Sequence, residues 1–257
     1  MDRHVVHEYL DSYIPPEKIH NPRTVNIITD GTYFGERKED TSWCVIVVRD
    51  SYKREDLVWL FTKTETTHAY SVLRDRLEAL GYTIASVTGD GFEGIKSGFS
   101  GIPFQMCHVH MERRIIRGTT QNPQTEAGEV LLALVRTLFQ GTNSKTFNRR
   151  LNEYVTKYRA FLNEKTLHPI TGKRSWTHED LRSAVYALIR QRYNLFTFEQ
   201  DKNIPKTTNS LEGHFAHIKK IIAVHNGLSQ HRKERILNSI LLASTTAPRV
   251  DKLDDIL

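Results

Sequence analysis

Three acidic residues, far apart in the chain, stand where they could share divalent cations. Asp30 follows the β-branched run "TVNIIT", Asp90 follows "YTIASVTG", and each aspartate is followed at once by a glycine. Both runs are typical of strands, so each aspartate is expected at the C-terminal end of a strand, with the glycine turning the chain away. The third acid, Glu212 in "TTNSLEGHF", lies near the start of a segment with apolar residues at helical spacing.

Two aspartates and a glutamate offer hard oxygen ligands for a pair of divalent ions about 3.5 to 4 Å apart. Clustered carboxylates need such a cation to stay ionised, and the ions would polarise a phosphodiester and activate an attacking water or hydroxyl. Each acid also has an ordinary structural explanation. Asp-Gly is a common turn, and Asn209 followed three residues later by Glu212 resembles a capping box at a helix start.

The composition describes a globular chain with a nucleic-acid bias. Its 257 residues are 39% hydrophobic and 26% charged, with a formal net charge of +6. That balance supports a substantial core and favours a polyanionic partner. The sequence shows neither a membrane-length apolar run nor a signal-peptide pattern, so we expect a cytoplasmic or nucleoid-associated protein.

Strand and helix patterns along the first half predict a mixed sheet. Three β-branched or aromatic runs follow one another as a meander, then a helix, a fourth strand, a glycine-punctuated turn or helix, a fifth strand and another helix. This order indicates an α/β fold with a mixed sheet. The strands are expected at 24–30, 43–50, 56–62, 82–90 and 102–107, and the helices at 67–80 and 108–118.

The second half is expected to be helical. Apolar residues recur every three or four positions between residues 119 and 203, and Pro205 marks a break before the helix that carries Glu212. We therefore expect a chain divided into an N-terminal segment or linker (1–24), a first part of the core (25–118), an all-helical insertion (119–203) and C-terminal core helices (204–257).

The order of the motifs resembles a known family. "IITDGTYFG", "SVTGDGFEGIKSGF", "PFQMCHVHMERRI" and "TTNSLEGHFAHIKK" together are similar to the catalytic core of DDE transposases with an RNase H-like fold, particularly the bacterial insertion-sequence and Mutator-like branch. That branch also has a C-x-x-H pair after the second aspartate and a helical insertion before the glutamate helix. The resemblance implies a mixed five-stranded sheet with flanking helices and covers roughly Val25 to Ala243.

The resemblance also implies roles for individual residues. Asp30, Asp90 and Glu212 would bind two Mg²⁺ ions, with Mn²⁺ as a possible substitute, and Asn209 would position Glu212 or a phosphate. Cys107 and His110 would organise the strand-to-helix junction near the active centre or contact DNA, although a buried thiol beside a hydrogen-bonded histidine is the alternative.

Zinc is not expected at this pair, even though "CHVH" contains typical zinc ligands. A structural zinc site needs four ligands, usually from two paired clusters, and the second cysteine, Cys44, lies in a different expected strand.

Basic residues gather around these motifs and suggest the DNA contacts. Trp176 stands beside Lys173 and Arg174 and could stack on an unpaired base, or it could simply be a core residue. The Glu212 helix would turn its polar face, which also includes His214, toward phosphates. The remaining expected DNA-binding residues are Arg113, Arg114, His217, Lys219 and Lys220.

The function implied is DNA transposition: phosphodiester cleavage at transposon ends and transfer of the exposed 3′-hydroxyl into target DNA. The partners would be double-stranded DNA and further copies of the chain, as a homodimer or higher oligomer, because two ends must be joined. No zinc ribbon or helix-turn-helix pattern precedes Val25, so we expect either a shortened reading frame or end recognition that comes from elsewhere. Two alternatives remain open: a domesticated or truncated transposase-derived DNA-binding protein, and an RNase H-like structure-selective nuclease.

Overall fold

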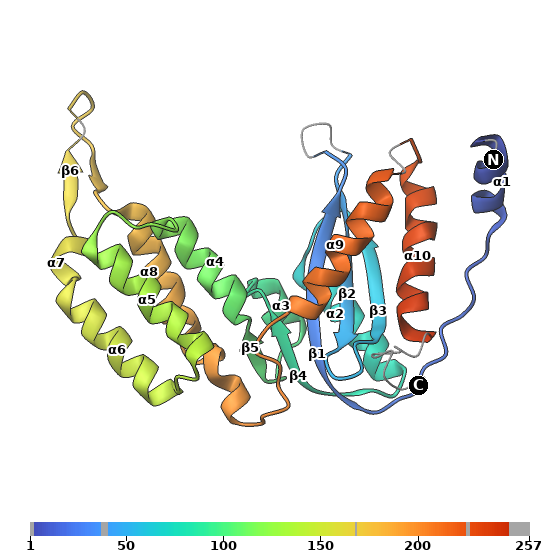
Figure 1. The fold of residues 1–257 in the computed structure, drawn as a ribbon, viewed down its shortest axis with the longest axis horizontal. Coiled ribbons are helices and arrows are strands. Elements are labelled where there is room, and N and C mark those ends of the chain that lie inside the picture. The colour runs from blue at the N-terminus through green and yellow to red at the C-terminus, as the bar shows by residue number, and fades with distance from the viewer. Residues whose placement is uncertain (1–2, 37–40, 168, 225–226, 247–257) are drawn as a thin grey trace, which may run out of the picture. The chain divides into compact units, whose positions relative to one another are not determined.

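The computed structural model describes residues 3–36, 41–167, 169–224 and 227–246 (Figure 1). The described residues fall into two compact units. The first unit comprises those within Met1–Ala85, Ser97–Phe99 and Asn209–Leu257, and the second those within Ser86–Lys96 and Ser100–Thr208.

The sheet has five strands in the order β3-β2-β1-β4-β5. Strands β1, β2 and β3 form an antiparallel meander, whereas β4 and β5 are parallel, so the expected mixed five-stranded sheet is confirmed. Strand β4 begins beside β1, where Thr83 N–H donates to the Arg23 carbonyl at 3.1 Å. The strands are β1 Thr24–Phe34, β2 Trp43–Asp50, β3 Asp56–Thr62, β4 Thr83–Gly89 and β5 Phe104–Met106.

One face of the meander is covered by two C-terminal helices, which Figure 1 shows in orange and red. Helix α9 (Asn209–Val224) places a stripe of apolar residues in the core with side chains of β1 and β2, and α10 (Gln230–Thr246) adds Leu237 and Leu241. The opposite face packs against α2 (Thr67–Ala79), whose Thr66 side chain caps the helix start. Helix α1 (Arg3–Ser12) lies beside α10, where Arg235 donates to the carbonyls of Leu10, Asp11 and Tyr13.

The second unit is mainly helical, and it packs around α4 (His108–Thr119) and α8 (Glu179–Gln191). A side chain at Gly118 would meet Ala184 Cβ and the Asp180 carbonyl oxygen, both at 2.7 Å, so glycine is what allows α4 and α8 to approach so closely. The other helices are α3 Glu93–Gly98, α5 Glu126–Arg136, η2 Thr137–Gln140, α6 Ser144–Lys157, α7 Arg159–Leu162 and η3 Asn194–Glu199.

The sequence suggested an all-helical insertion, but the structure contains a short β-hairpin there. Strands β6 (Lys165–Leu167) and β7 (Arg174–Trp176) pair as an antiparallel hairpin, which is the pointed yellow element in Figure 1. Its strands are only three residues long, and apart from the half-buried Trp176 their side chains are exposed. The hairpin therefore lacks the long alternating apolar pattern by which a strand is recognised in a sequence.

The first strand is longer than expected, and this changes the position of Asp30. Pairing between β1 and β2 continues past Asp30↔Val47 to Phe34↔Trp43, and the chain turns only at Gly35, where φ is +74°. Asp30 therefore lies within the strand and does not close it. Gly31 has ordinary strand geometry, and its missing side chain instead makes room for Glu65, whose carboxyl would lie 2.6 Å from an added Cβ.

Candidate active site

Asp30 lies on the face of the sheet that α9 covers. Side chains alternate along a strand, so residues 28, 30, 32 and 34 of β1 share one face. Ile28 and Phe34 belong to the core formed with α9, as does Val47, which is the cross-strand partner of Asp30. The Asp30 side chain is half-buried, and its Oδ1 accepts a hydrogen bond of 2.9 Å from the Gly31 N–H. Asp30 thus puts a carboxylate beside the apolar core residues that pack beneath α9.

Glu212 stands in the first turn of that same helix. Leu211, Phe215, Ile218 and Ile222 are the buried stripe of α9, and Glu212 is adjacent to Leu211 and half-buried. At about 100° per residue, Glu212 lies on the flank of the stripe and not on the outer surface of the helix.

Asp30 and Glu212 therefore belong to the same unit and lie on the same side of the meander. Asn209 is the first residue of α9 and is exposed, three residues ahead of Glu212. The pattern of core residues brings Asp30 and Glu212 to one layer between sheet and helix. Both offer carboxylate oxygens, which suit a hard divalent ion such as Mg²⁺.

Asp90 lies in the second unit, directly after the last residue of β4, as the sequence suggested. Its Oδ1 accepts a hydrogen bond of 2.8 Å from the Phe92 N–H, and Gly91 has a φ of +84°. A side chain at Gly91 would be strained by this backbone conformation, and its Cβ would lie 2.5 Å from Met106 Sδ. The turn therefore depends on glycine and leaves the half-buried Asp90 at the end of its strand.

Asp90 lines a cleft of about 810 Å³ within the second unit. Residues of α4 form one wall and residues of α8 another, with the turn after β4 between them. Cationic side chains outnumber acidic ones along the lining. The charged side chains that line the cleft are Lys96, Arg114, Arg117 and Arg190 on the basic side, and Asp90, Glu93 and Asp180 on the acidic side.

The cleft contains cations that the sequence analysis did not single out. Arg117 is one of them, and it lies on the same side of α4 as His110 and Arg114, since residues three and four apart on a helix are neighbours. That spacing is visible in the sequence and could have identified Arg117. Arg190 and Lys96 come from other elements, so only the tertiary structure could place them in the cleft.

The Cys107–His110 pair contacts the residue that immediately precedes α9. Thr208 is fully buried; its N–H and its hydroxyl lie 3.4 Å and 3.5 Å from Cys107 Sγ, and its Oγ1 lies 3.4 Å from His110 Nδ1. Burial alone would raise the pKa of Cys107, but the hydrogen bonds from His110 and Thr208 bring that pKa below its ordinary value. The pair thus holds the strand-to-helix junction together with the chain that leads into α9.

Two more contacts hold the same segment in the second unit. Thr88 Oγ1 donates to the Pro205 carbonyl at 2.8 Å, and His108 N–H donates to the Lys206 carbonyl at 3.0 Å. The side chain of His108 is buried and bonds to the Leu195 carbonyl at 2.8 Å, so it is a core residue. Cys44 is buried in β2 of the first unit, where burial raises the pKa of its thiol to about 12.

Trp176 in the hairpin is a half-buried residue whose ring is contacted by cations. Arg182 lies 3.9 Å and Lys165 Nζ lies 4.3 Å from the ring centroid. Arg182 also bonds to the Leu162 carbonyl and to the Tyr186 hydroxyl, so it joins the base of the hairpin to the helices. The neighbouring Lys173 and Arg174 are exposed.

The remaining expected DNA-binding residues are on helix surfaces. His217, Lys219 and Lys220 are exposed on α9 of the first unit, and Arg113 is exposed on α4 of the second. Arg113 is not among the residues that line the cleft, unlike its neighbour Arg114.

Comparison with protein families decides the relationship. The family model described as Transposase IS66 family matches residues 24–222, a range that contains Asp30, Asp90 and Glu212. The chain belongs to the IS66 transposase family. Its mixed sheet of order β3-β2-β1-β4-β5 with flanking helices fits the RNase H-like fold that the motifs indicated.

A solved structure is also similar to the chain, more distantly. It is the cryo-EM structure of the simian T-cell lymphotropic virus intasome in complex with PP2A regulatory subunit B56 gamma, with 16% sequence identity and a TM-score of 0.25. The match covers 64% of this chain and 57% of that chain. No protein of curated function matches the sequence significantly. Within the described residues, the helices include none that is both long and apolar enough to span a membrane.

Proposed function

We propose that this chain is the catalytic part of a transposase that cuts DNA at transposon ends and joins the exposed 3′-hydroxyl to target DNA. The observation that carries the proposal is the family match across 24–222, because it spans three acids that the motif order had already singled out. Asp30 and Glu212 on one side of the meander, and Asp90 in a cleft that Arg114, Arg117 and Arg190 also line, support the assignment.

The three carboxylates are proposed to bind two Mg²⁺ ions, or Mn²⁺ in their place. When bound, the ions would supply charge stabilisation at the phosphodiester and a more acidic water. The backbone of Asp30 is held by its strand, and that of Glu212 by the helix whose buried stripe packs on the core. Asp90 is fixed by its bond from the Phe92 N–H and by the glycine turn.

The cleavage step needs no covalent bond to the protein. A water oxygen attacks phosphorus, the bond between phosphorus and the 3′ oxygen breaks, and that oxygen takes up a proton. In the transfer step the 3′-hydroxyl attacks a target phosphodiester, loses its proton, and releases the target's own 3′ oxygen. The protein's task is to orient these groups and to hold the charged backbone.

The basic residues are proposed to hold the DNA backbone. Arg114 and Arg117, which line the cleft with Asp90, would bind phosphates there, because guanidinium groups bind phosphate oxygens in a bidentate manner. The exposed hairpin, with Lys173 and Arg174, would contact DNA at a further point, and α9 would add His217, Lys219 and Lys220. Arg113, exposed on α4, would contact a neighbouring phosphate.

The Cys107–His110 pair is proposed to act on the path of the chain and not on the DNA. Its contacts hold Thr208, the residue just before α9 and four positions before Glu212. We therefore assign it the role of organising the junction that leads to the third acid.

A strand-cleavage and strand-transfer assay tests the proposal. Labelled DNA carrying the ends of the element that encodes the chain is incubated with Mg²⁺ and either wild type or Glu212→Gln. We expect nicking and joined products with wild type and a loss of at least about a hundredfold in Glu212→Gln, which keeps the shape of the side chain but removes its charge.

Glu153→Gln is the matched control, because Glu153 is an exposed acid on α6. It should cut like wild type. Equal activity in wild type and Glu212→Gln would reject the metal role of Glu212. DNA binding by wild type without cutting would favour a transposase-derived binding protein, and cutting that depends on DNA structure but not on the end sequence would favour a nuclease.

A further inference from the structure

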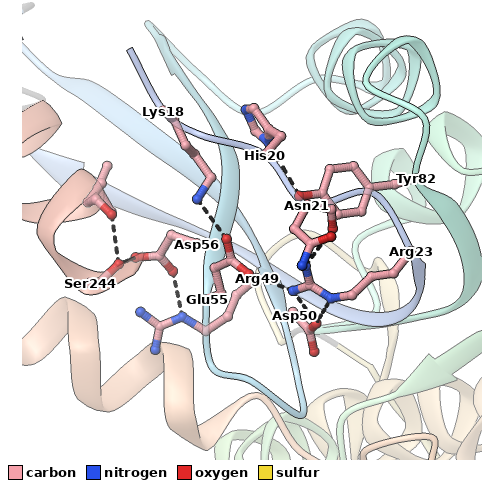
Figure 2. A network of polar contacts seen from close by, with 11 residues as sticks. Lys18, His20, Asn21, Arg23, Arg49, Asp50, Glu55, Asp56, Tyr82 and Ser244 are labelled. Atoms are coloured by element: carbon pink, nitrogen blue, oxygen red, sulfur yellow. Dashed lines mark hydrogen bonds and ion pairs between the residues drawn. The ribbon is translucent and has the colours of Figure 1, made fainter. Parts of the chain in front are cut away.

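The proposed chemistry assigns no role to a buried carboxylate of β3 that lies beside His214 of α9. Asp56, the first residue of β3, is 0% exposed. Its Oδ1 accepts a bond of 2.5 Å from Arg49 Nε, and its Oδ2 accepts one of 2.6 Å from Ser244 Oγ (Figure 2). His214 Nε2 lies 3.1 Å from the same Oδ2. A buried charge is costly unless it is paired and hydrogen-bonded, so these partners are required by Asp56.

The contacts keep this carboxylate ionised. Burial would raise the pKa of Asp56, but the close approach of the His214 ring and the hydrogen bond from Arg49 outweigh it and lower that pKa below its ordinary value. Arg49 is also almost fully buried, and its NH1 donates to the Ser210 carbonyl at 3.0 Å. One guanidinium therefore links Asp56 to the first turn of α9.

The cluster joins four elements of the first unit. Arg49 comes from β2, Asp56 from β3, His214 from α9 and Ser244 from α10. The β2–β3 register is irregular at Val48/Arg49, and this irregularity lies where Arg49 pairs with Asp56. Both contacts to α9, at Ser210 and His214, fall within two residues of Glu212.

The geometry of the helix connects the cluster to Glu212. Residues 212 and 214 are about 200° apart on a helix, so they lie on opposite flanks of the stripe that contains Leu211 and Phe215. A contact that fixes the His214 flank against Asp56 also sets the rotation of α9 about its axis. Hydrophobic packing is non-directional, so the apolar stripe alone would tolerate small rotations of α9 about its axis. The polar contacts of the cluster would prevent such rotations.

We propose that Asp56, with Arg49, His214 and Ser244, is a positioning cluster that sets the rotation and the first turn of α9 and so aims Glu212 at the metal ions. The inference rests on the proposed function, since it deepens the role of Glu212. The four residues touch neither substrate nor ion; they act through the helix.

The decisive variant is Asp56→Asn, measured by Mn²⁺ binding to the whole chain and by cleavage. Binding is read by the electron paramagnetic resonance signal of free Mn²⁺, which does not require activity. We expect the Mn²⁺ dissociation constant to rise about tenfold, the low end of the effect seen when residues that orient ligands are changed. The Mg²⁺ concentration for half-maximal cleavage should rise in parallel, whereas affinity for DNA without a divalent ion should stay the same.

Arg23→Gln is the control for a merely structural effect. Arg23 bonds to Asp50 at 2.7 Å and to Glu55 at 2.5 Å, a second partly buried network of the same unit, drawn in Figure 2. This variant should lower the melting temperature while leaving the Mn²⁺ affinity unchanged. Arg49→Lys keeps the charge beside Asp56 but loses the guanidinium fork that reaches Ser210, so an intermediate affinity is expected.

The outcomes separate the two proposals. Wild-type Mn²⁺ affinity in folded Asp56→Asn, or an equal loss in Arg23→Gln, overturns the positioning role and leaves the transposase assignment intact. If wild type binds Mn²⁺ and loses that binding in Glu212→Gln but cuts no DNA, the proposed function fails, and the affinity of Asp56→Asn still decides the role of the cluster. If Asp56→Asn does not fold, Arg49→Lys and His214→Gln supply the same comparison.

Discussion

Asp30 pairs with Val47 in the middle of the β1–β2 ladder, four residues before β1 ends at Phe34. The candidate metal ligand is thus held by hydrogen-bonded strand on both sides and not by a turn. The glycine after it packs against Glu65, whose Oε2 accepts a bond of 2.5 Å from the Tyr70 hydroxyl. Packing of Glu65 against Gly31 thus supports one face of β1, while Asp30 points its carboxylate to the other face.

Gly31→Ala should destabilise the protein by about 1 kcal/mol, because an added Cβ would push the Glu65 carboxyl away from Tyr70 and weaken that hydrogen bond. Gly213→Ala is the matched control. Gly213 lies within α9, and an added Cβ there would have no neighbour within 4 Å, so it should stabilise by about 0.5–1 kcal/mol. Urea unfolding of the two variants measures both, and a stabilised Gly31→Ala would contradict the close packing at Glu65.

Arg114→Ala should weaken DNA binding nearly uniformly across sequences and reduce the slope of log affinity against log salt by about 1, because a phosphate contact releases about one counterion. Arg117→Ala should behave in the same way. Fluorescence anisotropy over a salt series measures both slopes. Arg150→Ala, at an exposed position on α6 away from the cleft, should keep the wild-type slope. An unchanged slope in Arg114→Ala would remove the cleft from the DNA path.

Binding of end DNA should quench the fluorescence of Trp176. The ring lies under Arg182 and Lys165 in an exposed hairpin, so a base that stacks on it must displace a cation, and the emission will change. Trp43 is buried in the core of the first unit. Titration of wild type beside Trp176→Phe assigns the signal. Equal quenching in both proteins, or none in wild type, would make Trp176 a packing residue only.

Acid should remove the stability that Asp56 contributes. The folded pKa of Asp56 lies below its ordinary value of 3.8, so the folded state favours the ionised form. Its contribution is therefore fully present above about pH 4 and is lost as pH falls from 3.8 through the lower folded pKa. Urea unfolding from pH 7 to pH 3 should show the gap between wild type and Asp56→Asn shrinking only at the acidic end. A gap that is constant down to pH 3, or one that widens there, would contradict a lowered pKa.

Much of the fold could be read from local patterns. The bounds of β2 and β3 follow the runs "WCVIVVRD" and "DLVWLFT", and the helix after them ends within one residue of the expected position. These segments are regular because burial imposes the same spacing on every residue of a strand or helix face. Asp90 also lies where the sequence placed it, because Gly91 is required by a positive φ that few other residues adopt.

Asp30 shows where local patterns fail. Asp-Gly has the same sequence signature whether glycine serves a turn or a close contact, and only the pairing with β2 and the approach of Glu65 distinguish the two. The β6–β7 hairpin was missed for a related reason, since three-residue strands with exposed side chains carry no burial pattern.

The sequence by itself determined the order of the elements that carry the five-stranded sheet, the family and the three candidate acids, since these follow from residue types and from spacing along one chain. Only the tertiary structure decided that Asp30 lies under α9, that Arg190 joins Arg114 in a cleft, and that Asp56 ties β3 to both C-terminal helices. Those facts depend on contacts between residues far apart in the sequence, which are set by the packing of whole elements and leave no periodic signal in any one of them.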